Sequence, residues 1–191
     1  MSEFGASSAT VWLLDGTLVQ EDDLAFFAQQ LSASEANRYA CFGRRARQRQ
    51  FLIGRMLLRF AASRVLSLTP DTFGVVERDG NAPQLVLPDG QYLRQGFSIS
   101  HSREWVVCAV SSNGSLGVDI EVESPGRDIM GISYLAFHPK DHYWLLRQAE
   151  TARLSAFYQL WCTREALYKL LSSFGREMML LPLMGFNGTV T

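Results

Sequence analysis

Three acidic residues alternate with apolar ones in the middle of the chain, at Asp119, Glu121 and Glu123. Residues two apart on a β-strand share a face, so a strand here would turn these carboxylates to one side and Val118 and Ile120 to the other. A row of like charges is destabilising unless a cation neutralises it, and carboxylate oxygens are ligands that suit Mg²⁺. The spacing therefore favours a magnesium site, with an ordinary solvated strand face as the alternative.

A second group lies further along the chain, where Trp161, Glu165 and Lys169 are four residues apart. On a helix this spacing places them on one stripe. Glu165 and Lys169 alone would form a routine surface ion pair, which contributes only about 0.3–0.5 kcal/mol. The bulky Trp161 on the same stripe indicates that the stripe faces protein, and a buried pair of this kind needs a functional reason.

Hydroxyl and imidazole groups come together at the end of another expected strand. In the segment Phe97–Ser102, the alternation of residues predicts a strand that delivers Ser100 and His101 to a loop. Their side chains and the backbone donors of the loop would suit a phosphate. A turn whose hydroxyls bond to the local backbone is the alternative.

Arginines are concentrated in one stretch of the N-terminal half. Several lie at the start of a helix expected over Ala46–Leu66, where the helix dipole disfavours cations. Guanidinium groups and free backbone N–H groups both bind phosphate, so this placement favours a bound anion. A solvated basic face is the alternative for any single member of the set, which comprises Arg38, Arg44, Arg45, Arg47, Arg49, Arg55, Arg59 and Arg64.

The elements that must position these residues follow from hydrophobic periodicity and turn residues. Strands are expected over Val11–Leu14, Phe73–Glu77, Phe97–Ser100, Trp105–Val110 and Leu116–Val122. The last three would form a meander, with Ser112–Gly114 as a hairpin turn and Asp79–Pro83 as an earlier turn. Besides Ala46–Leu66, helices are expected over Glu21–Leu31, Ser34–Phe42 with Ser34 as its cap, Phe137–Leu146, and Thr151–Phe174 ended by Gly175. This mixed order of elements predicts an α+β fold.

Composition limits the functional classes. The chain has 191 residues, 47% hydrophobic and 19% charged, which can bury a core as one domain or as two small halves. A net charge of -1 gives no case for nucleic-acid or membrane binding. Three scattered cysteines, the lack of a signal-peptide pattern and the short apolar runs predict a reduced cytoplasmic protein without structural zinc.

Four segments together resemble the motifs of one enzyme family. Leu116–Glu121 resembles (I/V)G(I/V)DIE, and Trp161–Lys169 resembles W-x-x-K-E-(A/S)-x-x-K. Phe97–Ser102 resembles F-(N/S)-(I/L)-S-H-S, and Phe51–Arg59 resembles F-L-x-G-R-x-L-L-R. Their order and spacing are similar to those of the 4′-phosphopantetheinyl transferase superfamily, in its surfactin-synthetase-type branch.

This resemblance implies a monomer built as a pseudo-dimer, in which two related α/β halves form the active site at their interface. Residues 1–104 would be the N-terminal half, with the helix and strands that bind the coenzyme A phosphates. Residues 105–191 would be the C-terminal half, with the metal-binding strand and the catalytic helix, and relative to the family its end would be shortened.

The resemblance also implies a reaction. Such an enzyme moves the phosphopantetheine arm of coenzyme A to a serine of an apo acyl or peptidyl carrier protein, with Mg²⁺, and releases adenosine 3′,5′-bisphosphate. Glu165 would deprotonate the carrier serine, and Lys169 would neutralise charge on the pyrophosphate. The implied metal ligands are Asp119, Glu121 and Glu165. The expected coenzyme A ligands are Ser100, His101, Arg47, Arg49, Arg55 and Lys169.

Two departures from the family pattern bear on coenzyme A binding. The lysine of the family's G-K-P segment, which would hold the adenosine 3′-phosphate, is missing from Gly80–Pro83. Gln50 replaces an arginine, for which Arg49 or Arg47 would substitute. These departures leave a coenzyme A- or carrier-binding accessory module, with weak or no transferase activity, as the main alternative. An unrelated Mg²⁺-dependent phosphohydrolase that uses the same carboxylates is another.

Overall fold

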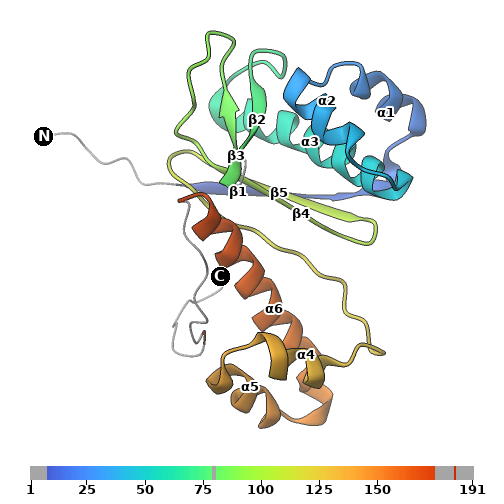
Figure 1. Ribbon diagram of the computed structural model, residues 1–191, viewed down its shortest axis with the longest axis vertical. Coiled ribbons are helices and arrows are strands. Elements are labelled where there is room, and N and C mark those ends of the chain that lie inside the picture. Colours follow the sequence, from blue (N-terminus) through green and yellow to red (C-terminus); the bar gives the residue numbers. More distant parts are fainter. Residues whose placement is uncertain (1–7, 79–80, 175–182, 184–191) are drawn as a thin grey trace, which may run out of the picture.

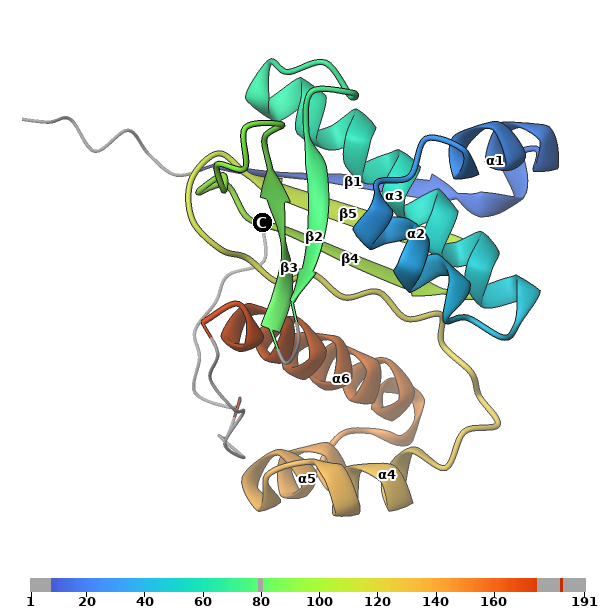
Figure 2. The same ribbon diagram turned by 45° about the horizontal axis from the view of Figure 1, so that its top comes forward.

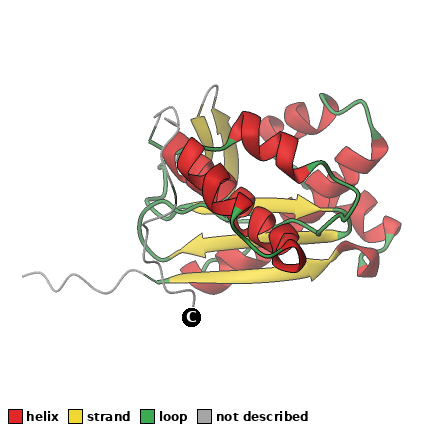
Figure 3. Ribbon diagram, turned by 90° about the horizontal axis from the view of Figure 1, so that it is seen from below, coloured by secondary structure: helices red, strands yellow, loops and turns green. Residues whose placement is uncertain are grey.

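A three-stranded antiparallel sheet forms the centre of the molecule. The computed structural model describes residues 8–78, 81–174 and 183. In the sheet, β5 (Trp105–Ser111) lies between β1 (Ala9–Asp15) and β4 (Phe97–Ser102). Figure 3 shows these strands side by side, seen from below. The predicted strands at these three places are confirmed.

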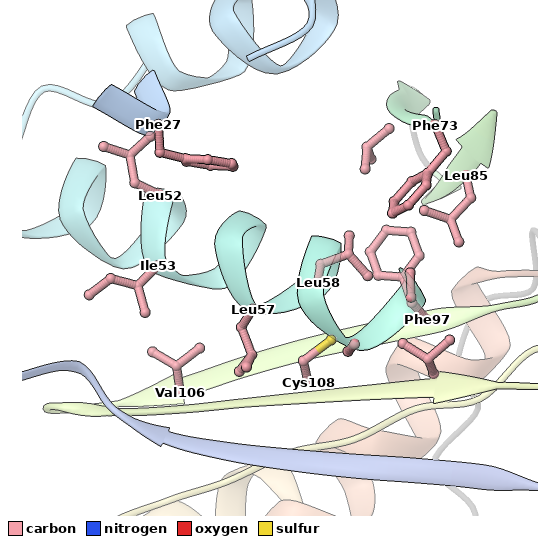
Figure 4. Packing of buried hydrophobic residues seen from close by; sticks show 14 of the residues in the cluster. Phe27, Leu52, Ile53, Leu57, Leu58, Phe73, Leu85, Phe97, Val106 and Cys108 are labelled. Atoms are coloured by element: carbon pink, nitrogen blue, oxygen red, sulfur yellow. The ribbon is translucent and has the colours of Figure 1, made fainter. Parts of the chain in front are cut away.

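The long helix α3 (Arg45–Leu66) covers one face of this sheet, as Figure 1 shows. Leu57 and Leu58 of α3 meet Val106 and Cys108 of β5 in the main core, which Figure 4 shows from close by. Leu58 and Cys108 are both 0% exposed. Burying such side chains contributes roughly 1.5–3 kcal/mol each, which is enough to fix α3 against the sheet.

Two short helices pack on the outer side of α3. A 3₁₀ turn (Gly16–Leu18) leads from β1 to α1 (Glu21–Ala28), and α2 (Ala33–Ala40) follows. The expected cap of α2 was wrong, because Ser32 and not Ser34 accepts a hydrogen bond from the Glu35 N–H, at 3.3 Å. The Glu35 side chain returns the bond to the Ser32 N–H, so the two residues form a capping box.

A separate hairpin joins β2 (Gly74–Arg78) to β3 (Asn81–Val86). The first strand was expected, but β3 was not, because its first residues were assigned to a turn. Asp79 and Gly80, the rest of that expected turn, lie outside the described residues. Pro83 is tolerated within β3 because this sheet has only two strands, so each strand has a free edge.

The remaining helices form a second packing unit on the other side of the sheet (Figures 1 and 2). They are α4 (Ile129–Ala136), which was not expected, α5 (Pro139–Leu146) and α6 (Glu150–Ser172). Phe137 and Phe157 stack at the centre of their core, with ring centroids 5.4 Å apart. Gly175, the expected end of the last helix, lies outside the described residues. Among the described residues, no helix combines the length and hydropathy needed to cross a membrane.

The strand expected over Leu116–Val122 was wrong. No strand follows Ser111 in the described part of the chain, and Gly114 forms only an isolated bridge with Gln95. The segment is held to β4 through serine side chains instead of a backbone ladder. The α+β class is confirmed, while two related α/β halves stay a prediction. The expected division between residues 104 and 105 falls in the turn between β4 and β5, and β5 packs in the first core.

Candidate active site

Asp119 lies between the sheet and α6 and is held from both sides. The Ser100 hydroxyl of β4 donates a hydrogen bond to its Oδ1 atom, at 2.6 Å. The Lys169 ammonium of α6 donates to the same oxygen at 2.7 Å and to the Val118 carbonyl at 3.0 Å. The strand that was expected to end at Ser100 and deliver Ser100 and His101 to a loop continues to Ser102, so both residues lie within β4.

Gly117 allows the segment around Asp119 to approach the backbone of α6. A Cβ atom at this position would lie 1.9 Å from the Ala166 carbonyl oxygen, far inside van der Waals contact. Only a glycine fits this crossing. The contact places Asp119 against the turn of α6 that carries Glu165 and Lys169.

Glu165 is electrostatically coupled to both expected acidic partners. Burial raises its pKa, and the negative charges of Asp119 and Glu121 raise it further, against an opposing effect of Lys169. The structure therefore brings the three expected carboxylates into one neighbourhood. The raised pKa means that negative charge on Glu165 is unfavourable here as long as no cation compensates it.

Whether a cation fits among these three carboxylates depends on which of their oxygen atoms are free to bind it. Among the described residues, no cluster of three His, Cys, Asp or Glu side chains is already arranged to hold a metal ion. However, Asp119 Oδ2 is buried and has no hydrogen bond of ordinary geometry in the described part of the chain; the weakly donating Cys162 thiol also interacts with this carboxylate. An unpaired buried carboxylate oxygen is costly, and hard oxygen donors suit Mg²⁺. The donor set therefore fits a divalent cation.

A cavity of about 800 Å³ lies between α2, α3, the β2–β3 hairpin, β4 and the end of α6, and it is lined by Lys169, the partner of Asp119. Glu77 is the only carboxylate among the described residues that line it. Its cationic or basic lining residues are Arg38, Arg47, Arg55, Arg78, His101 and Lys169. This excess of positive charge in a concave site suits a polyanionic ligand.

His101 is a neutral acceptor in this cavity. Arg47 lies 3.0 Å from its Nε2 atom, and a guanidinium group can only donate, so Nε2 accepts and the proton is on Nδ1. Burial lowers the pKa of His101, and the charge of Arg47 lowers it further. Both effects keep the imidazole uncharged beside Arg47.

Arg55 is the most deeply buried cation of the cavity, with 5% of its surface exposed. Its guanidinium donates to Glu77, and its ζ carbon lies 4.9 Å from the Phe51 ring centroid. Burial lowers its pKa, while the charges of Glu77 and Glu35 oppose this effect. Its Nε atom is buried without a hydrogen-bond partner among the described residues.

Not every expected residue reaches the cavity. The Arg49 guanidinium donates to the carbonyls of Gly16 at 2.9 Å and Val19 at 2.6 Å, and to Glu21, so it is directed away from the cavity. Ser100 binds Asp119 and is not among the lining residues.

Two lining arginines had not been assigned to the site. Arg38 belongs to the arginine-rich stretch but was not singled out. Arg78 pairs with Asn81 across the hairpin and donates two hydrogen bonds to the Ala82 carbonyl, at 2.9 and 2.7 Å. Its position just before the Gly80–Pro83 segment is the signal that could have identified it, had a hairpin been expected there.

Comparison with known proteins agrees with the motifs. A family model described as "4'-phosphopantetheinyl transferase, N-terminal" matches residues 19–113, and one described as "4'-phosphopantetheinyl transferase superfamily" matches residues 115–187. A 4′-phosphopantetheinyl transferase of Bacillus subtilis is 38% identical over 120 residues, which are 62% of this chain and 50% of that protein. The transferase Sfp of Bacillus subtilis strain 168 is 27% identical over 157 residues, 82% of this chain and 66% of that protein.

A solved structure of Helicobacter pylori holo-[acyl-carrier-protein] synthase, in complex with coenzyme A, also matches. Its TM-score is 0.41 at 18% identity, over 54% of this chain and 97% of that one. The chain spans about half the length of the first Bacillus relative. The two family models adjoin and describe the same family, which confirms the prediction from the four motifs. The chain belongs to the 4′-phosphopantetheinyl transferase superfamily.

Proposed function

We propose that this protein transfers the 4′-phosphopantetheine arm of coenzyme A to a serine of an apo acyl or peptidyl carrier protein and releases adenosine 3′,5′-bisphosphate. The observation that carries the proposal is the position of Asp119. It has an unpaired buried oxygen, is bonded to Lys169, and adjoins a cavity lined by arginines. A reaction at a pyrophosphate needs this combination of cation site and positive charge.

Asp119, Glu121 and Glu165 would hold Mg²⁺, in keeping with the free oxygen of Asp119 and the coupling of Glu165 to both other carboxylates. When bound, the ion would neutralise negative charge on the pyrophosphate oxygens.

The cavity would receive coenzyme A. Its volume of about 800 Å³ is within the range of small-molecule sites. Lys169, His101 and Arg47 line the part next to Asp119 and would contact the pyrophosphate. Arg55 and Arg78 line the part next to the hairpin, where a second phosphate of the same ligand would find cationic partners. Arg38 adds to the positive charge.

The chemical step follows from these positions. The carrier serine oxygen attacks the β-phosphorus of coenzyme A, and the bond from this phosphorus to the oxygen bridging the two phosphorus atoms breaks. Glu165 accepts the proton of the serine hydroxyl, directly or through water. Lys169 neutralises the charge that develops on the leaving phosphate. The protein itself makes no covalent bond, so orientation and charge carry the catalysis.

We expect a cytoplasmic monomer that binds neither nucleic acid nor membrane, in which two related halves meet at this site. The family models divide at residues 113 and 115, after β5. This favours a division there over one between residues 104 and 105.

The test is the mass of an apo carrier protein after incubation with coenzyme A and Mg²⁺. Addition of one phosphopantetheine group supports the transferase, whereas coenzyme A binding without any mass change would favour the accessory module. Asp119→Ala and Glu165→Gln should reduce the rate by about 10²–10⁴-fold and leave the fold intact. Lys169→Ala should slow transfer more than it weakens coenzyme A binding. Glu123→Gln, in the third acidic residue of the same row, is the matched control and should retain activity.

A further inference from the structure

We infer that Ser100 and Ser102 are positioning residues, whose hydroxyls orient the carboxylates of Asp119 and Glu121 and do not bind the phosphates of coenzyme A. The inference rests on the proposed function of these carboxylates. It departs from the expectation that Ser100 is a coenzyme A ligand.

The geometry comes from three serines that alternate along β4. Ile99, between two of them, packs against the core under α3, so the serines point to the opposite face of the sheet. There the Ser98 hydroxyl accepts a hydrogen bond from the Val118 N–H at 3.1 Å. Ser100 follows with its bond to Asp119 at 2.6 Å.

Ser102 makes the most complete contact of the three. Its hydroxyl donates to Glu121 Oε2 at 2.7 Å and accepts from the Val122 N–H at 3.0 Å. A hydroxyl has one donor and two acceptor sites, so this single side chain orients both the carboxylate and its backbone. The segment has no strand pairing of its own, and these bonds take the place of a ladder.

The serines also determine which carboxylate oxygens stay free. Asp119 Oδ1 accepts from both Ser100 and Lys169, while Oδ2 is buried without a hydrogen bond of ordinary geometry among the described residues. In Glu121 the serine engages Oε2 and leaves the other oxygen. Each serine thus holds one oxygen of a carboxylate and leaves the second for a cation.

The position of the serines relative to the cavity supports the same reading. Ser98 lines the cavity, whereas Ser100 and Ser102 are not among its lining residues. Ser100 is only 7% exposed and its hydroxyl proton is already directed at Asp119. A phosphate in the cavity would therefore meet other donors first.

The test measures Mn²⁺ binding to the full chain in the absence of coenzyme A. Electron paramagnetic resonance detects the free and bound ion. Ser102→Ala and Ser100→Ala should weaken Mn²⁺ binding by about 10-fold or more, because outer partners of metal ligands commonly have effects of this size. Ser102→Thr, which keeps the hydroxyl, should restore most of the affinity. Ser63→Ala is the matched control, because it removes one serine hydrogen bond on the exposed side of α3.

The affinity for coenzyme A, measured in EDTA so that no divalent cation is present, distinguishes a serine that positions a carboxylate from a serine that binds coenzyme A directly. Positioning residues should leave that affinity within about twofold of the wild type, since their effect acts through the cation site. Unchanged Mn²⁺ binding in both alanine variants would overturn the inference. So would a loss of Mn²⁺ affinity in Ser102→Thr as large as that in Ser102→Ala, or a wild type that binds no Mn²⁺. Carrier modification by the wild type is measured in parallel. Absence of transfer, with the Mn²⁺ pattern intact, would refute the proposed function and leave the positioning role standing.

Discussion

Two arginines near the start of α3, Arg47 and Arg49, have different neighbours. Arg47 lines the cavity and contacts His101, whereas Arg49 binds the carbonyls of Gly16 and Val19 behind it. Two residues along a helix correspond to a rotation of about 200°, so side chains at this spacing point to nearly opposite sides. Only the first of the two is in a position to contact a ligand.

This contrast predicts different effects of the same substitution. Arg47→Met should weaken coenzyme A binding by about 10-fold or more, because a hydrogen bond to a charged group contributes roughly 1.5–3 kcal/mol. Arg78→Met should weaken it as well. Arg49→Met should leave the dissociation constant unchanged and lower the melting temperature, because two partly buried hydrogen bonds to carbonyls are lost. Isothermal titration calorimetry measures the dissociation constant, and thermal unfolding measures the melting temperature. A loss of coenzyme A affinity in Arg49→Met would show that Arg49 does contact the ligand.

The lowered pKa of His101 leads us to expect that the stability of the folded protein depends on pH. The pKa of His101 in the folded protein is below the ordinary value of about 6.5, first through burial and then through Arg47. Between these two pKa values the unfolded chain binds more protons, so the folded state loses stability as pH falls below about 6.5. Thermal unfolding from pH 8 to pH 5.5 should therefore show a smaller loss in His101→Gln than in the wild type. Equal losses would contradict the prediction.

A buried ion network joins α2, α3 and β2 on the far wall of the cavity. Glu35 is 0% exposed and accepts two hydrogen bonds from Arg59, at 3.0 and 2.8 Å. Arg55 lies 3.6 Å from the same carboxylate and donates to Glu77 of β2. Burial alone would raise the pKa of Glu35, but the hydrogen bonds and charge of Arg59 outweigh it, and the pKa is lowered. The network thereby fixes Arg55 in the cavity wall.

Glu35→Gln should destabilise the protein by about 3–5 kcal/mol, because it leaves buried arginines without their counter-charge. Glu21→Gln is the matched control. Glu21 is 62% exposed in its pair with Arg45, so its loss should cost less than about 1 kcal/mol. Denaturant unfolding at neutral pH gives both values. The difference should shrink as pH falls through the lowered pKa of Glu35, where the wild-type carboxylate is protonated too. Equal effects of the two variants would show that the network is not stabilising.

Periodicity predicted the long elements well and the short ones poorly. α3 and α6 carry apolar residues at helical spacing over many turns, so their existence was clear. Strict alternation over Leu116–Val122 correctly put Asp119 and Glu121 near one another, but it does not reveal whether an extended segment pairs in a sheet. Here serine side chains replace the ladder. β3 was missed because its first residues are typical of turns.

The site was predictable to the extent that it depends on local spacing. Glu165 and Lys169 share a face of α6 because they are four residues apart. That this face lies against Asp119, on a distant segment, could be expected only from the family resemblance. The direction of Arg49 and the approach of Arg78 depend on how the hairpin and the 3₁₀ turn pack. Tertiary contacts of this kind leave no periodic signal in a single sequence.

At the scale of the whole molecule, the two packing units meet along the segment that carries the acidic residues. The sheet with α3 lies on one side of it, and α6 with α4 and α5 on the other, as Figure 2 shows. β4 supplies the serines and α6 supplies Glu165 and Lys169. The site therefore exists only while both units stay in register with this segment. At Gly117 the segment lies so close to α6 that a Cβ atom would be 1.9 Å from the Ala166 carbonyl oxygen.

Gly117→Ala should separate α6 from the acidic segment. The new methyl group would lie 1.9 Å from the Ala166 carbonyl oxygen, which is backbone and cannot rotate away. The helix must shift, and Lys169 then loses its bonds to Asp119 and Val118. A displacement of about 1 Å costs roughly 100-fold in rate when it affects aligned catalytic groups. We expect a loss of this size in carrier modification, measured by mass spectrometry.

Gly126→Ala is the matched control, since a Cβ atom there meets nothing within 4 Å and the backbone needs no positive φ. It should retain activity and stability. The Gly117→Ala variant should also weaken Mn²⁺ binding, because α6 carries Glu165 away from Asp119, while circular dichroism still reports the helices of both units. Full activity in Gly117→Ala would mean that the segment moves together with α6, and that contact with β4, not with the helix, determines where the carboxylates lie.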